Sequence, residues 1–146
     1  MRSIKTTLSI VIASFMGLAA MAQKTNSAHI PLAVKNAFTT AYPAVKTVKW
    51  EKEKGDFEAG FMQGSNKMSA VFKADGSQVE SEMEIKPDAL PAAVIVYVKR
   101  HYKSATIKEA AKITNSASGE IMYEAEVKGT DLLFDSVGKF KKIARD

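Results

Sequence analysis

"LPAAVIVYVKRHYK", residues 90–103, repeats the pattern of an earlier stretch, "IPLAVKNAFTTAYP", residues 30–43. In both stretches an apolar or aromatic residue recurs at every fourth position, first at Ile30, Val34, Phe38 and Tyr42, then at Leu90, Val94, Val98 and Tyr102. This spacing predicts two amphipathic helices, each with a single apolar stripe. Pro31 and Pro91 suit the first turn of each helix, where the missing amide hydrogen costs little.

Strand-like alternation follows each predicted helix. The segments after the first helix lie near residues 45–53, 57–62, 68–73 and 79–85. Those after the second lie near 107–113, 121–127, 131–135 and 139–143. Clusters rich in Gly, Asn and Asp separate them, as expected for turns. We therefore expect an α+β fold of two tandem helix-plus-antiparallel-strand repeats, at about 30–85 and 90–143, with the helices packed on one face of a roughly eight-stranded sheet.

The N-terminus has the features of an export signal. Arg2 and Lys5 precede an apolar run at residues 8–20, and Ala20 and Ala22 occupy the positions that a signal peptidase reads. We predict a cleaved signal peptide at 1–22 and a single domain at 23–146, periplasmic or secreted, with no stable membrane insertion after cleavage. A retained membrane anchor is the alternative.

Composition narrows the chemistry further. The chain has no cysteine, which excludes disulfides, thiolate metal sites and a lipoprotein anchor. Its formal charge of +5 falls to +3 once Arg2 and Lys5 are removed (5 − 2). So small a charge does not indicate a nucleic-acid binder, and a solvated surface accounts for it.

One strand carries a row of carboxylates. Within "KADGSQVESEMEI", residues 73–85, the apolar Val79, Met83 and Ile85 share one parity, whereas Glu80, Glu82 and Glu84 fall on the other. Successive side chains of a strand point to opposite faces. We expect the apolar set to face the helices and the three glutamates to line an uncovered, solvated face.

Aromatic residues suggest where the core lies. Trp50, Phe57, Phe61 and Tyr123 occupy alternating strand positions, which favours packing beneath the helices. An aromatic platform for a ligand is the alternative.

Several segments together resemble the PepSY-like, beta-lactamase-inhibitor-like family of exported bacterial proteins. The matching pieces are Trp50 before "GDFEAGF", then "VFKADGS", "LPAAVIVYVKRHY", "GEIMYEAEV" and "LLFDSVGKF". The resemblance implies a tandem helix-and-sheet fold, with one eight-stranded sheet or two smaller abutting sheets. It also implies a binder or inhibitor of other exported proteins, including peptidases and other hydrolases. It supplies no catalytic residues, and this chain differs from the disulfide-containing inhibitor relatives in having no cysteine.

Enzymatic and metal chemistry find little support. No serine has a nucleophile-elbow context, and His101 with Glu109 could imitate a base and its orienter only if the fold brought them together. We interpret His101 as a solvated residue at a helix end. A single row of glutamates could share a hydrated Ca²⁺, but Ca²⁺ requires six or more oxygen ligands. We therefore predict no catalytic residues, no metal and no cofactor.

The lysines near the C-terminus have two possible roles. Lys139, Lys141 and Lys142 could attract an anionic partner, or they could protect an edge strand from unwanted pairing.

The function that these patterns favour is an exported, noncatalytic protein- or peptide-binding module, with inhibition of an envelope or secreted hydrolase as its specific form. The candidate contact residues lie on the open face: Met62, Glu80, Glu82, Glu84, Met122, Glu124 and Glu126. Methionines adapt to apolar groups, and carboxylates can meet lysine or arginine. The alternatives are a carrier or sensor that binds a small envelope ligand between the two repeats, and a calcium-stabilised structural domain.

Overall fold

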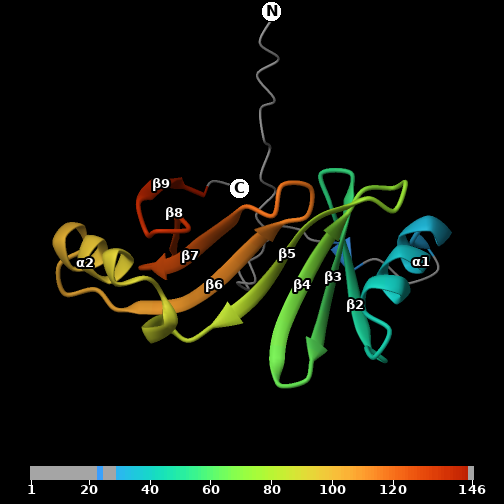
Figure 1. Ribbon diagram of the computed structural model, residues 1–146, viewed down its shortest axis with the longest axis horizontal. Coiled ribbons are helices and arrows are strands. Elements are labelled where there is room, and N and C mark those ends of the chain that lie inside the picture. The colour runs from blue at the N-terminus through green and yellow to red at the C-terminus, as the bar shows by residue number, and fades with distance from the viewer. Residues whose placement is uncertain (1–22, 25–28, 145–146) are drawn as a thin grey trace, which may run out of the picture.

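The computed structural model describes residues 23–24 and 29–144, so the expected signal peptide at 1–22 lies outside the described residues. The described part contains two ten-residue helices, a short 3₁₀ helix and nine strands (Figure 1). In chain order the elements are β1 (Gln23–Lys24), α1 (Leu32–Ala41), β2 (Val48–Glu53), β3 (Asp56–Gln63), β4 (Asn66–Phe72), β5 (Gln78–Ile85), the 3₁₀ helix η2 (Pro87–Ala89), α2 (Ala92–His101), β6 (Ile107–Asn115), β7 (Ile121–Val127), β8 (Thr130–Asp135) and β9 (Phe140–Ile143).

All nine strands form one antiparallel sheet in which each strand pairs with the next one along the chain. The eight longer strands, β2 to β9, correspond to the eight that the sequence predicts, and β1 adds two residues at the edge. β5 pairs with β6 from Glu80 opposite Asn115 to Ile85 opposite Ala110, although η2 and α2 lie between them in the chain. The strands of the two halves are therefore continuous, which confirms the α+β class.

The helices begin directly after the two prolines of the repeated stretch. α1 buries Val34 and Phe38, and α2 buries Val94 and Val98, which confirms the apolar stripes read from the sequence. Each helix is short, so its stability comes mainly from packing this stripe rather than from helix propensity.

Two apolar clusters hold the helices to the strands, one in each half. Phe38 of α1 contacts Phe61 and Trp50, with ring centroids 5.1 and 5.4 Å apart. Val94 and Val98 of α2 belong to a second cluster with residues of β6, β7 and β8. Trp50, Phe57 and Phe61 are buried in the first cluster and Tyr123 packs against the second, so the predicted core role of the four aromatic residues is confirmed.

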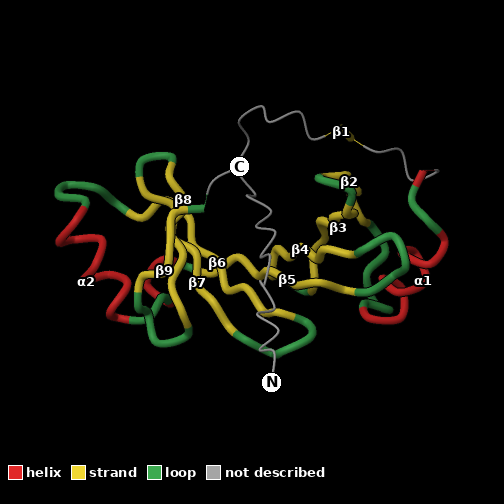
Figure 2. The backbone as a smooth tube through the Cα atoms, turned by 90° about the horizontal axis from the view of Figure 1, so that it is seen from above, coloured by secondary structure: helices red, strands yellow, loops and turns green. Residues whose placement is uncertain are grey.

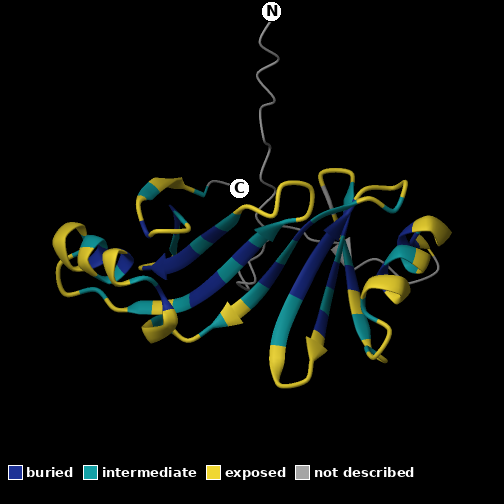
Figure 3. Cartoon of the chain, viewed as in Figure 1, coloured by how far each residue is buried: buried dark blue, intermediate teal, exposed yellow. Residues whose placement is uncertain are grey.

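The two helices lie at opposite ends of the sheet (Figure 1), and the sheet is strongly curled between them (Figure 2). The middle strands β4 to β7 are buried along much of their length, whereas the turns and the outer helix surfaces are exposed (Figure 3). The curl creates a concave face, and the candidate site lies on it.

Matching turns press against the start of each helix. Gly76 follows β4 with φ +89°, and a Cβ atom at this position would lie 2.7 Å from the carbonyl oxygen of Ala33 in α1. Gly138 follows β8 with φ +86°, and a Cβ there would lie 3.0 Å from the Cβ of Ala93 in α2. Both positions therefore need glycine for the backbone conformation and for the close approach of the helix.

Replacing Gly76 with alanine should lower the free energy of unfolding by at least about 2 kcal/mol, because a positive φ and a backbone clash add together. Urea denaturation monitored by circular dichroism measures the change. Gly64→Ala is the matched control, since Gly64 has φ +62° and no atom within 4 Å of the added Cβ. The control should lose only about 1 kcal/mol, and equal losses in the two variants would contradict the proposed contact with α1.

Candidate functional site

The concave face, hereafter the acidic face, follows from the pairing of the strands. Residues directly opposite one another in an antiparallel pair lie on the same face. Glu82 of β5 lies opposite Ser69 of β4 and Ile113 of β6. Ala111 of β6 lies between Glu84 of β5 and Glu124 of β7. Glutamates from both halves of the chain therefore share this face.

Like charges also stand directly opposite one another on the acidic face. Glu126 of β7 pairs with Glu109 of β6 on one side and with Asp131 of β8 on the other. Such pairs destabilise an antiparallel ladder unless a proton or a cation neutralises them. Between Glu84 and Glu124 the small Ala111 leaves room for the two carboxyl groups.

The expectation that the glutamates are solvated is wrong for four of them. Glu80, Glu82, Glu124 and Glu126 expose 3, 6, 7 and 4% of their surface, and Met122 is buried as well. Only Met62 and Glu84 are exposed, as expected. The strand register places these side chains on one face of the sheet. We expected that face to be uncovered, but alternation along a strand specifies only a direction and not the exposure of the face.

Part of the acidic face is apolar. Ile113, Met122 and Leu133 form a buried cluster there, with Ala144 packed against it. This cluster lies beside Glu82, because Ile113 is the residue opposite it on β6. An apolar neighbour removes water from a carboxylate and supplies no hydrogen bond in return.

The expectation that the apolar residues of β5 face the helices is only partly met. Val79, Met83 and Ile85 are all half-buried, and Ile85 packs against the second core. Val79 lies at a register shift where Gln78 takes the place opposite Phe72. The Gln78 side chain donates a hydrogen bond of 3.1 Å to the Tyr42 hydroxyl, so a polar residue occupies the position expected for a core valine.

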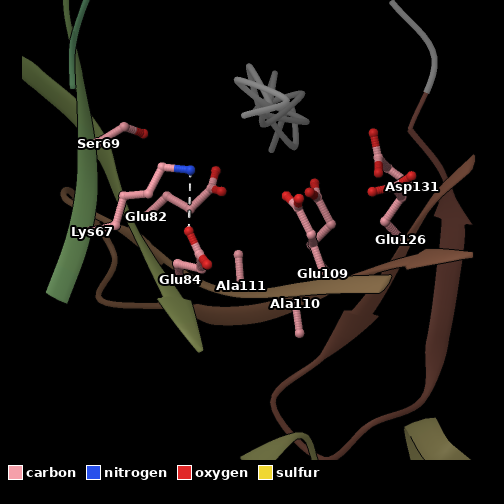
Figure 4. A pocket seen from close by; sticks show the side chains of 10 residues that line it. Lys67, Ser69, Glu82, Glu84, Glu109, Ala110, Ala111, Glu126 and Asp131 are labelled. Atoms are coloured by element: carbon pink, nitrogen blue, oxygen red, sulfur yellow. Dashed lines mark ion pairs between the residues drawn. The ribbon is translucent and has the colours of Figure 1, made fainter. Parts of the chain in front are cut away.

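A small cavity opens where the carboxyl groups of the acidic face converge. Its volume is about 20 Å³, room for roughly one water-sized group. Figure 4 shows side chains from β4 and β5 on one side and from β6 to β8 on the other, pointing into the same space. The lining residues are Lys67, Ser69, Glu82, Glu84, Glu109, Ala110, Ala111, Glu124, Glu126 and Asp131.

Three carboxylate oxygens at this cavity are buried without a hydrogen bond. They are the Oε2 atoms of Glu82, Glu124 and Glu126. The other oxygen of Glu126, Oε1, lies 4.0 Å from Nζ of the exposed Lys108, and Lys67 pairs with the exposed Glu84 at 3.2 Å. A buried, unpaired carboxylate is costly, so the site favours either a bound proton or an added cation.

Burial and neighbouring charge raise the pKa values of these acids. Burial raises the pKa of Glu124 to about 8, with repulsion from Asp131 adding to the effect. Burial raises the pKa of Glu80 to about 7, reinforced by Glu58, while Lys142 opposes the shift. Burial also raises the pKa of Glu82 well above its usual value, and Glu124 is the strongest charged contributor. Near neutral pH the acidic face therefore shares protons among several groups.

The remaining candidate residues lie elsewhere. His101 is the last residue of α2, where Nδ1 lies 2.9 Å from the Tyr97 carbonyl oxygen and the ring stacks on Tyr97. His101 does not line the cavity that Glu109 lines. Across residues 23–24 and 29–144, no group of three or more His, Cys, Asp or Glu side chains is arranged to hold a metal ion.

The C-terminal lysines lie at or next to the sheet edge, because β9 is the last strand in the sheet order. Lys139 precedes this strand, and Lys141 and Lys142 lie within it, all three exposed. Lys142 also pairs with Leu133, which places it on the acidic face near Glu80.

The contact residues predicted from the sequence did not include five residues of this face: Glu58, Lys67, Ser69, Glu109 and Asp131. A signal for Glu58 was present, since it alternates with the core residues Phe57 and Ala59 and so shares the parity of the acidic face. Asp131 and Glu109 carried no such signal, because only the strand register brings them to either side of Glu126.

A second, larger cavity of about 610 Å³ lies within the first half of the chain. It is lined by the segment 44–47 together with Lys49, Gly60, Phe61, Met62 and Lys67. Lys67 lines both cavities, and the exposed Met62 joins the rim of the acidic face to this groove.

Comparison with protein families identifies the same repeat twice. The model of the PepSY-like family, described as beta-lactamase-inhibitor-like, matches residues 18–76 and again residues 55–142. Two matches to one family model confirm the tandem repeat. No curated protein matches the chain.

Solved structures share the fold at low sequence identity. A Bacteroides eggerthii protein described as periplasmic is 17% identical, with a TM-score of 0.71 over 80% of this chain and 88% of that chain. A Bacteroides uniformis protein of the DUF2874 family is 18% identical, with a TM-score of 0.69 over 78% and 88%. A BLIP-like protein of Bacteroides fragilis is 18% identical, with a TM-score of 0.62 over 77% and 83%. Within the described residues, neither helix has the length and apolar character needed to span a bilayer.

The raised pKa of Glu124 predicts that stability falls as pH rises from about 5 to 8. The folded protein binds a proton more tightly than the unfolded chain, whose value is near 4.5, so the stabilisation is complete below that value and is lost as pH rises through about 8. Glu124→Gln should flatten the dependence by up to about 1.4 kcal/mol per pH unit, measured by urea denaturation at several pH values.

Glu120→Gln is the control, since Glu120 is exposed and lies immediately before β7. It should keep the wild-type slope. A Glu124→Gln variant with the same slope as the wild type would show that Glu124 is ionised throughout this range and would contradict the expected pKa.

Proposed function

Because the chain belongs to the PepSY-like, beta-lactamase-inhibitor-like family, we propose that it is an exported, noncatalytic module that binds a protein or peptide with its acidic face. The periplasmic description of the Bacteroides eggerthii relative supports a periplasmic or secreted location. In this proposal residues 1–22 are the signal peptide and residues 23–146 form one domain. The BLIP-like relative supports inhibition of an envelope or secreted hydrolase as the specific activity.

One observation carries this proposal: buried carboxylate oxygens on a concave face that no cation of the described chain satisfies with a hydrogen bond. Glu82 and Glu124 are costly to the isolated protein, because burial and mutual repulsion both oppose their charge. A partner with positive charge would relieve that cost on binding. A surface that is poorly satisfied alone and satisfied in a complex is expected of a binding site.

In this proposal the two helices cover the face of the sheet that lies opposite the acidic face. Cross-strand pairing runs from Met68 through Met83, Lys112 and Tyr123 to Phe134, so these residues share a face. Met68 packs against the cluster that contains α1, and Phe134 belongs to the cluster that contains α2. The register therefore supports placing both helices on that face, which leaves the acidic face for a partner.

In this proposal the exposed residues Met62 and Glu84, hereafter the rim of the acidic face, make the first contacts with the partner. Met62 is 53% exposed and Glu84 is exposed beside Lys67. A flexible methionine next to a charged pair can adapt to an apolar group of the partner while the charges orient it. Binding there would cover the cleft of a hydrolase without any covalent step.

A carrier or sensor that binds its ligand between the two repeats has weaker support. The cavity where the two halves meet has a volume of about 20 Å³, whereas ligand pockets usually measure about 300–1,000 Å³. The cavity suits a single chemical group rather than a whole molecule.

Site-specific photocrosslinking tests the proposed surface. A photoreactive phenylalanine analogue placed at Met62 or at Glu84 should yield an adduct with the same exported protein when the protein is made in its native envelope. The same residue at Leu32 or Val96, exposed at 72 and 58% on α1 and α2, is the control and should yield at least about tenfold less of that adduct. Equal adducts from the helix positions, or none from the rim positions, would reject the acidic face as the contact surface.

A further inference from the structure

We propose that the cavity on the acidic face is a socket for one ammonium group, which a lysine side chain of the partner inserts between Glu82 and Glu124. This inference rests on the proposed binding function and names the chemical group that the site recognises.

The unpaired oxygens point to a ligand that donates hydrogen bonds. Glu82 and Glu124 are more than nine-tenths buried, line the cavity, and each leaves its Oε2 atom without a hydrogen bond. Once a cation displaces the bound proton, the ionised carboxylate only accepts hydrogen bonds, so the partner that satisfies it in the complex is a donor. An ammonium group has three N–H donors and a full positive charge, and it can therefore serve both carboxylates at once.

The size of the cavity favours an ammonium over a guanidinium. The volume of about 20 Å³ accommodates a group close to the size of a water molecule. The lysine ammonium is compact and sits at the end of a flexible apolar stem, whereas the arginine guanidinium is planar and broader. Ala111, directly between Glu84 and Glu124, and Ser69, opposite Glu82, keep the floor of the cavity small and leave room for the methylene stem.

A divalent metal fits this arrangement less well. Ca²⁺ requires six or more oxygen ligands at short range. In the portion of the chain that the structure describes, the acidic side chains do not gather into a group of three that could hold a metal ion. Two diagonal carboxylates on β5 and β7 suit the three donors of an ammonium group better.

Every element around the socket contributes charge. The facing groups are Glu58 of β3, Lys67 of β4, Glu80 and Glu84 of β5, Lys108 and Glu109 of β6, Glu126 of β7, Asp131 of β8 and Lys142 of β9. Acids outnumber bases in this set, and their repulsion adds to burial in raising the pKa values of Glu82 and Glu124 in the free protein. An entering ammonium would displace a proton bound there, which couples binding to pH.

The experiment uses n-butylammonium, a mimic of the lysine side chain that stays charged in this range because its amine resembles that of lysine, with a pKa of about 10.4. The probe is titrated into protein carrying ¹³C at the glutamate carboxyl carbons, and NMR follows each resonance. We expect saturable shifts at Glu82 and Glu124. As pH rises from 6 to 7, the apparent dissociation constant should fall by up to about tenfold per pH unit for each proton released on binding.

Three variants and two further probes complete the design. Glu82→Gln and Glu124→Gln imitate the protonated side chain, so both should fold, and each should weaken binding of the probe by at least about tenfold. Glu120→Gln, at an exposed position outside the cavity, should leave the binding unchanged. Methylguanidinium should bind more weakly than n-butylammonium. Stronger, saturable shifts with CaCl₂ at the same carboxyl groups would overturn the proposal in favour of a divalent-cation site.

The outcomes separate the socket from the binding function. If the probe shifts Glu120 as much as Glu82, or binds independently of pH, the socket is rejected. If in addition Met62 and Glu84 still crosslink to the partner in the Glu82→Gln and Glu124→Gln variants, the binding function stands without the socket. If the probe binds as expected while the rim positions give no partner adduct, the socket stands and the protein-binding function fails.

Discussion

The alternation of side chains across a continuous antiparallel sheet is the constraint on which the rest of this structure depends. Phe38 and Val94 lie in separate clusters, and each packs on strand residues of a single parity. The strand residues that alternate with these core residues must therefore lie on the other face, because a shift of one position in register would move every core residue to the wrong face. Glu82 and Glu124 point to the acidic face because their neighbours along the same strands, Met83 on β5 and Tyr123 and Ala125 on β7, have the opposite parity.

The repeat and the acidic face have different origins. The helices, their prolines and the turns at Gly76 and Gly138 recur in both halves, since each half needs the same device to hold a helix on a hairpin. The acidic face does not recur in this way. It combines β5 of the first half with β6 to β8 of the second, and it exists only because β5 and β6 pair. The repeated halves supply the scaffold, and the pairing of β5 with β6 creates the site.

The buried carboxyl groups of the acidic face reduce the stability of the folded protein. Buried carboxylates with raised pKa values lower the free energy of unfolding near neutral pH, and Gln or an apolar residue would avoid this cost. Residues that destabilise the fold are expected at positions where function requires them. The conflict here is concentrated on the acidic face, whereas the two apolar clusters around α1 and α2 follow the ordinary rules of core packing.

The sequence by itself determined the two helices, the eight longer strand segments, the core aromatics and the common parity of Glu80, Glu82 and Glu84, because these depend on local periodicity and on turn residues. Only the tertiary structure decided that Glu80, Glu82, Glu124 and Glu126 are buried. Periodicity specifies direction relative to the sheet but carries no information about curvature, which arises from the pairing and twist of many strands together. For the same reason Asp131 could be assigned to the site only from the register of β7 and β8.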